Sequence, residues 1–145
     1  MSSIVFANNS SNLGEYSTPS GFRFFGYTKE DCISESGDFN EEEQACYHSA
    51  ENTITIKENP ENKKLVIISV IYGPANMRDF SGVVTQEKKG LLLAKEAAID
   101  EAGNVESLIN GGCNLNVIIK NNIASLKLGK TCDVDLERAS GAKKK

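Results

Sequence analysis

The residues that could do chemistry in this chain are few. His48 is the only histidine, and it follows Cys46 and Tyr47 in an acidic region. A lone imidazole is more often a surface or hydrogen-bonded residue than a general base. The chain has no nucleophile-elbow, Walker, dinucleotide-binding or zincin motif, and no spacing of its plentiful carboxylates singles out an acid–base pair. We therefore predict a protein that is not an enzyme, with a small carboxylate-dependent hydrolase as the least favoured alternative.

The strongest charge feature is the segment 31–46, which contains six carboxylates and no lysine or arginine. It lacks the ligand spacing of a calcium-binding loop. Clustered like charge steers the approach of an oppositely charged partner. The segment therefore predicts a docking site for a cationic protein, with four candidate contacts: Asp38, Glu41, Glu42 and Glu43. A solvated acidic loop without a partner is the alternative, and the sequence leaves it open.

The chain contains four cysteines: Cys32, Cys46, Cys113 and Cys132. They form no C-x-x-C pair, so a zinc ribbon or a thioredoxin-type site is not indicated, and we predict neither a metal nor a cofactor. Four cysteines allow three disulfide pairings. The local pairing, Cys32 with Cys46 and Cys113 with Cys132, closes two short loops and is favoured. Four reduced cysteines in a cytosolic protein are the alternative.

Length and composition predict one globular domain, because the chain has 145 residues, of which 39% are hydrophobic. We place this domain at 13–142, after a flexible leader at 1–12 and before a basic tail at 143–145. No apolar run is long enough for a transmembrane helix, and the net charge of −4 argues against a nucleic-acid partner.

Residues 1–7 fit the remnant of a signal peptide, because Val5-Phe6-Ala7 suits cleavage after Ala7. An ordinary frayed terminus is the alternative. Together with paired cysteines, the remnant predicts a periplasmic or secreted protein.

The clearest secondary-structure signal is a hairpin at 113–128. Two alternating segments flank Asn121 and Asn122, and asparagine tolerates the positive φ that a two-residue type I′ turn requires. Counting outward from this turn places Leu115 opposite Leu128 on a face that is apolar throughout, whereas a one-residue slip would destroy the match.

Further runs predict strands at 22–27, 53–57, 64–72, 80–85 and 131–136. The segment 91–102 is ambiguous. Its Ala, Leu, Glu and Lys residues favour a helix, but its position after a strand and a turn suits a β-meander, and we expect a strand that runs to about Glu96. Eight short strands predict a mainly β fold, either an antiparallel barrel or a curled sheet, that leaves no exposed edges.

The C-terminal part of the chain, residues 80–142, resembles small bacterial periplasmic β-barrel proteins of the lysozyme-inhibitor type. The similar features are the segment Phe80-Ser81-Gly82-Val83, the two late cysteines and the segment 138–142. The resemblance implies an eight-stranded barrel and a Ser-Gly loop that enters the lysozyme cleft, with Ser140 as the matching contact. The aromatic residue after that motif and the Trp-rich strand of those inhibitors are missing from this chain.

These features predict a non-enzymatic protein that binds and inhibits a protein partner, for which a lysozyme-like hydrolase is a candidate. Lysozymes are usually basic, which suits the acidic segment. One alternative is a lipocalin-like barrel that holds a small apolar ligand in its mouth. Another is an immunity protein that neutralises a delivered toxin.

Overall fold

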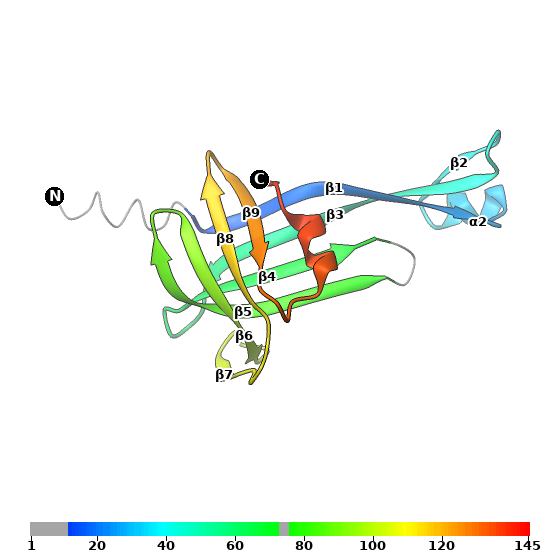
Figure 1. The fold of residues 1–145 in the computed structure, drawn as a ribbon. Helices are drawn as coiled ribbons and strands as arrows, with labels where there is room; N and C mark the ends of the chain where they lie inside the picture. The colour runs from blue at the N-terminus through cyan, green and yellow to red at the C-terminus, as the bar shows by residue number, and fades with distance from the viewer. Residues whose placement is uncertain (1–11, 73–75) are drawn as a thin grey trace.

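A computed structural model describes residues 12–72 and 76–145 as a mainly β protein (Figure 1). Its strands are β1 (Gly14–Phe25), β2 (Asp38–Asn40), β3 (Ala45–Glu58), β4 (Lys64–Ile71), β5 (Met77–Lys88), β6 (Leu91–Ile99), β7 (Val105–Leu108), β8 (Asn114–Lys120), β9 (Ile123–Leu128) and β10 (Ala142–Lys144). Its helices are α2 (Lys29–Ser34) and the 3-10 helix η1 (Val134–Ala139). The proposed signal remnant and all but the last residue of the proposed leader lie outside the described residues.

Eight strands close into an antiparallel barrel in the order β1-β10-β9-β8-β6-β5-β4-β3, and β3 pairs back with β1. The prediction of an antiparallel barrel is therefore confirmed. Two strands lie outside the ring, β2 on β3 and β7 on β6. The barrel closes through the short strand β10, which forms two residue pairs with β1 and two with β9.

Residues 143–145 do not form the basic tail that the sequence predicts. Lys143 and Lys144 belong to β10 in the barrel wall. The Lys145 ammonium lies 3.1 Å from a carboxylate oxygen of Glu15 and 3.0 Å from one of Glu51. Backbone pairing with two neighbouring strands and these ion pairs hold the lysines against the barrel.

The β8–β9 hairpin has the predicted register. Leu115 pairs with Leu128, and the inward residues between them and the turn are buried or half-buried. Asn121 and Asn122 have φ values of 54° and 62°, as the two-residue turn requires. The ambiguous segment forms strand β6 as far as Ile99, because β5 pairs with one of its edges and β8 with the other. These two neighbours override the helix propensity of its alanines.

The predicted strand at 131–136 is wrong, since the chain forms η1 there. Asp133 caps this helix, because its side chain accepts a hydrogen bond of 2.9 Å from the Asp135 amide. The buried residues Leu136 and Ala139 are three positions apart, which matches the period of a 3-10 helix. This spacing lets both side chains pack into one end of the barrel.

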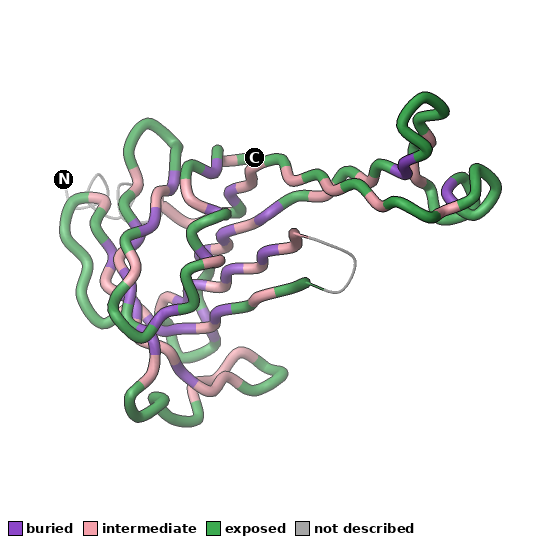
Figure 2. The backbone as a smooth tube through the Cα atoms, turned by 45° about the vertical axis from the view of Figure 1, so that its right-hand side comes forward, coloured by how far each residue is buried: buried purple, intermediate pink, exposed green. Residues whose placement is uncertain are grey.

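Side chains fill the barrel interior. The buried cluster draws on strands from β1 to β10 and includes Leu136 and Ala139 of η1. Burial is concentrated in the barrel and becomes sparse outside it (Figure 2). A Cβ atom on Gly82 would lie 2.6 Å from the Phe80 ring, so glycine is required for this ring to pack along the wall. A smaller cluster around Leu65 and Val83 lies apart from the main core, with Val105 of β7 packed against it.

Candidate protein-binding site

One part of the molecule projects from the barrel as an arm, which we define as residues 20–50 (Figure 1). β1 and β3 pair along their whole shared length, but β4 pairs with β3 only from residue 53 onward. The six pairs from Ser20–Ala50 to Phe25–Ala45 therefore extend the ribbon about 20 Å beyond the barrel. Helix α2 and strand β2 form the tip of the arm.

Polar contacts fix the root of the arm. The buried Asn52 side chain accepts a hydrogen bond of 2.9 Å from the Ile71 amide and donates one of 3.3 Å to the Arg138 carbonyl. The Ser20 hydroxyl donates a hydrogen bond of 2.7 Å to the Ile71 carbonyl. These bonds join β1 and β3 to the end of β4 and to η1, so the arm leaves the barrel in a defined direction.

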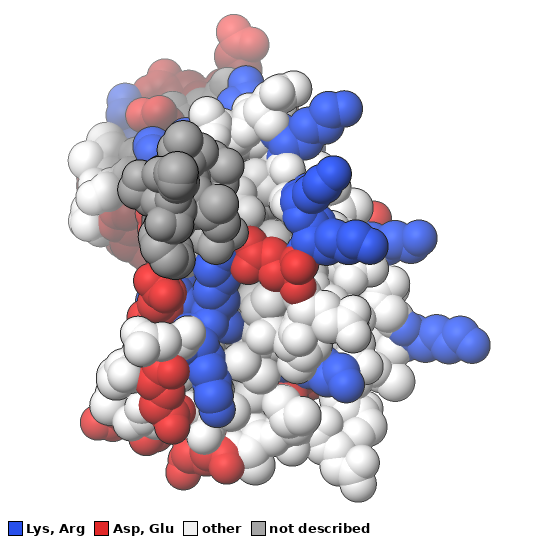
Figure 3. Space-filling model, turned by 90° about the vertical axis from the view of Figure 1, so that its left-hand side faces the viewer, with Lys and Arg blue, Asp and Glu red and all other residues white. Residues whose placement is uncertain are grey.

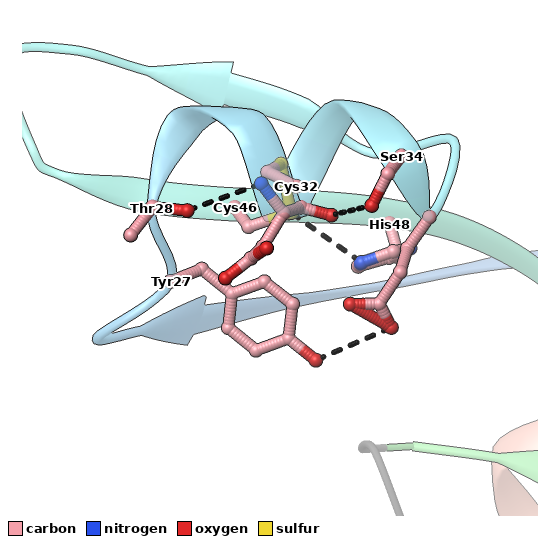
Figure 4. The surroundings of a disulfide bond; sticks show 8 residues. Tyr27, Thr28, Cys32, Ser34, Cys46 and His48 are labelled. Carbon is pink, nitrogen blue, oxygen red and sulfur yellow. Dashed lines mark hydrogen bonds between the residues drawn. A yellow bond between two sulfur atoms is a disulfide. The ribbon is translucent and has the colours of Figure 1, made fainter.

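A disulfide staples the tip. Cys32 of α2 bonds to Cys46 of β3 with a Cα–Cα distance of 5.6 Å, and Cys113 bonds to Cys132 in the barrel. The predicted local pairing is thus confirmed. The Thr28 hydroxyl caps α2 by accepting a hydrogen bond of 3.1 Å from the Asp31 amide (Figure 4). A Cβ atom on Gly37 would lie 2.5 Å from Cys46 Sγ, so a glycine lets the loop pack on the disulfide.

One face of the arm carries a cluster of four rings in contact. Phe24 lies at the centre, with ring centroids 5.2 Å from Phe22, 5.3 Å from Tyr27 and 5.0 Å from His48. His48 Nε2 also lies 3.4 Å from Cys46 Sγ (Figure 4). The rings cover one another in part. They stay half-buried because no strand of the barrel lies opposite them. The imidazole serves as a packing group in this cluster.

Large apolar side chains are also exposed on the arm. Phe25 at the end of β1 is 65% exposed and Ile33 on α2 is 59% exposed. The guanidinium of Arg23 lies 5.2 Å from the Phe25 ring centroid. Six of the ten aromatic residues of the chain lie between residues 22 and 47. Such a concentration of rings outside a core is typical of protein-binding surfaces.

The arm is strongly acidic. Seven carboxylates face two basic residues, Arg23 and Lys29, which leaves a net charge of −5. The four predicted contacts are all exposed at the tip: Asp38, Glu41, Glu42 and Glu43. The structure therefore brings these four carboxylates together.

Two of the predicted contacts are not free carboxylates, because residues outside the acidic segment reach them. Lys29 Nζ lies 2.6 Å from Glu41, and Arg23 lies 3.1 Å from Glu43. The hydrogen bond and charge of Lys29 hold the pKa of Glu41 below its ordinary value. Asp38 and Glu42 have no ion pair among the described residues.

The structure places Ser140 on the barrel, not on the arm. It follows η1, and its half-buried hydroxyl accepts a hydrogen bond of 2.8 Å from the Leu126 amide of β9. This bond gives the Ser-Gly motif a structural role beside the barrel seam. The motif does not form a projecting loop.

Sequence reasoning missed the aromatic part of the arm. The signal was present in the run Phe22-Arg23-Phe24-Phe25-Gly26-Tyr27, which is rich in aromatic residues but does not alternate as a half-buried strand would. Alternation fails because both faces of the ribbon carry rings. The acidic segment and the aromatic run become one surface only when β1 pairs with β3.

Other site chemistry is sparse in the part of the chain that the structure describes. Residues 12–72 and 76–145 contain no cluster of side chains suited to hold a metal ion and no helix suited to cross a membrane. A groove of about 1060 Å³ lies between β5 and β7, where Val83, Val105 and Leu108 line it together with polar residues.

Comparison of the chain with models of known protein families, with curated protein sequences and with solved structures finds no match. The function proposed below therefore rests on the geometry and chemistry of the arm.

Proposed function

We propose that this chain is a non-enzymatic binding protein that docks a cationic partner protein on its arm and inhibits it. The observation that carries the proposal is the combination of exposed Phe25 and Ile33 with five carboxylates that have no ion pair among the described residues. Apolar anchors supply affinity at protein interfaces, and surrounding charges speed encounter and select partners. A lysozyme-like hydrolase is the first candidate partner, because lysozymes are usually basic.

The construction of the arm supports binding through a preformed surface. The disulfide, the cap of α2 and the hydrogen bonds at Asn52 order the arm before a partner arrives. Ordering that precedes association lowers the entropy lost on binding. The filled barrel interior gives less support to a lipocalin-like ligand in the barrel mouth.

The two disulfides support maturation in an oxidising compartment, and we propose the periplasm or the cell exterior. An inhibitor of a cell-wall hydrolase would act in the same compartments.

The test uses a purified c-type lysozyme as the probe, with binding measured by interferometry and activity measured by lysis of bacterial cell walls. The protein should bind and inhibit the enzyme. Phe25→Ser combined with Ile33→Ser should weaken binding at least about tenfold, because both apolar anchors are lost. Val134→Ser is the matched control, since Val134 is 76% exposed but lies on η1.

A second variant tests the charges and spares the ion-paired Glu41 and Glu43. Replacing Glu30, Asp38 and Glu42 by their amides should slow association and flatten its salt dependence. Absence of binding and inhibition would overturn the lysozyme-like partner. Equal binding by the wild-type protein and the Phe25/Ile33 variant would overturn the arm as the docking site.

A further inference from the structure

A second surface of the molecule has the opposite charge to the arm. We define it as the lysine face, the outward side chains of β6, β8, β9 and β10 with the end of β5. Its basic residues are Lys88, Lys95, Lys120, Lys127 and Lys143. Lysine side chains stand on a largely uncharged surface there, as Figure 3 shows.

The strand register makes these residues one continuous face. Leu91 pairs with Lys88 on one side and with Ile118 on the other, and Ile123 pairs with both Lys120 and Lys143. Paired residues in neighbouring strands point to the same side of a sheet. No Asp or Glu occupies the outward positions of this stretch, which also include Gln86, Leu93, Asn114, Asn116 and Ser125.

The lysine face has the two properties that the arm would need in a partner. Its five lysines form no ion pair among the described residues, so their charge of +5 is available to match the −5 of the arm. It also exposes aliphatic side chains, since Leu91, Ile118 and Ile123 are 42%, 40% and 37% exposed. The arm offers exposed Phe25 and Ile33 with its carboxylates.

We propose that the arm of one copy of this chain docks on the lysine face of a second copy. The arm projects away from its own barrel, so the contact forms between molecules (Figure 1). It joins two different surfaces and is therefore heterologous, which extends into chains or closes into rings. This inference rests on the proposed function only in using the arm as a docking element, and a cationic partner would compete with the second copy.

Sedimentation at low and high salt tests the contact. At about 0.01 M salt, where the Debye length is about 30 Å, the average mass should rise with protein concentration, and about 1 M salt should abolish the rise. A lysine-face variant with Lys120, Lys127 and Lys143 changed to Glu should associate at least about tenfold more weakly. An arm variant with Glu30, Asp38 and Glu42 changed to Lys should lose association equally.

Mixing these two variants separates lost charge complementarity from misfolding. Each variant has an arm and a face of the same sign, whereas the mixture restores opposite signs, so association should return. A wild-type protein that stays monomeric at low salt, or a mixture that stays dissociated, would overturn the proposal. Monomers that bind anionic phospholipid vesicles through the three lysines would also overturn the proposal, since the lysine face would then fit a membrane surface.

The same variants keep this proposal distinct from the proposed function. The lysine-face variant retains the arm and should bind c-type lysozyme at least as tightly as the wild-type protein does. Monomeric protein that binds lysozyme through the arm would refute the contact between copies alone. Self-association without lysozyme binding would refute the lysozyme-like partner alone.

Discussion

The hairpin of β1 and β3 passes through two environments, and its side chains are buried in one and exposed in the other. Within the barrel, Tyr16 and Ile54 on the inner side of this hairpin are fully buried. Beyond the barrel, Phe22 and Phe24 continue the same side of β1 but are only half-buried, because no strand covers them. Apolar residues thus stabilise the fold in the first region and form a candidate interface in the second.

The arm needs its own stabilisation because an isolated two-stranded hairpin is marginal in water. The barrel draws on a contiguous core, whereas the arm has the Cys32–Cys46 disulfide, the ring cluster and the bonds of Asn52 at its root. The arm therefore adds little to the main core, whose buried residues lie outside residues 20–50.

The largest expected effect comes from a substitution in the barrel. Ile68 is fully buried, so Ile68→Ala should lower the free energy of unfolding by about 2–5 kcal/mol. Phe25→Ala on the arm should change it by less than about 0.5 kcal/mol. Denaturant unfolding of both variants measures these free energies. A similar loss for the two variants would contradict the contrast between the barrel and the arm.

The two disulfides should stabilise different parts of the protein although their loops are similar in length. Sequence separations of 14 and 19 residues each correspond to about 3 kcal/mol in the chain-entropy picture. Replacing Cys113 and Cys132 by Ala should lower the stability of the whole barrel by about that amount. Replacing Cys32 and Cys46 by Ala should instead speed amide hydrogen exchange within the arm and leave protection in β4 and β8 unchanged. A loss of protection in the barrel equal to that in the arm would show that the arm and barrel unfold as one unit.

The contrast between the barrel and the arm also explains what the sequence could predict. The β8–β9 hairpin was predictable because Asn121-Asn122 and the alternation beside it define the same register. The disulfides were predictable because each closes a short loop. The arm was not, because its pairing joins residues as distant as Ser20 and Ala50 across a segment that contains α2 and β2 and not one short turn.

Local patterns also misled at two places. Residues Cys132, Val134 and Leu136 alternate as a strand would, but Asp133 begins a 3-10 helix instead. The acidic segment appeared uncompensated because Arg23 and Lys29, which pair with two of its carboxylates, precede it in the sequence. The cap at Asp133 is a local interaction, whereas the two ion pairs are tertiary contacts.

A smaller effect is expected at the joint between the two regions. Asn52→Ala leaves the Ile71 amide and the Arg138 carbonyl without this partner and should cost about 1–3 kcal/mol in the free energy of unfolding. Thr55→Ala, on the outward side of the same strand, controls for lost strand propensity. Thermal unfolding of the two variants measures the difference in their stability, and equal melting temperatures would show that the Asn52 bonds do not stabilise the joint.

The smallest effect concerns the exposed Lys29–Glu41 ion pair. Its contribution is present above the ordinary carboxyl pKa and is lost as the pH falls through the lowered pKa of Glu41. Lys29→Gln should raise the pKa of Glu41 toward its ordinary value without changing the stability of the barrel. Carbon-detected NMR titration of the glutamate carboxyls measures this shift. An unchanged Glu41 pKa in the variant would show that the ion pair does not form in solution.

The most direct measurement of the central claim, that the arm is the docking surface, is an NMR titration of the isotopically labelled protein with unlabelled c-type lysozyme. Amide shifts should change within residues 20–50, most strongly near Phe25, Ile33 and Glu42, and the changes should fade at high salt. The amides of β4, β5 and β8 should stay in place. Shift changes centred on the barrel, or none at lysozyme concentrations well above that of the protein, would contradict the account.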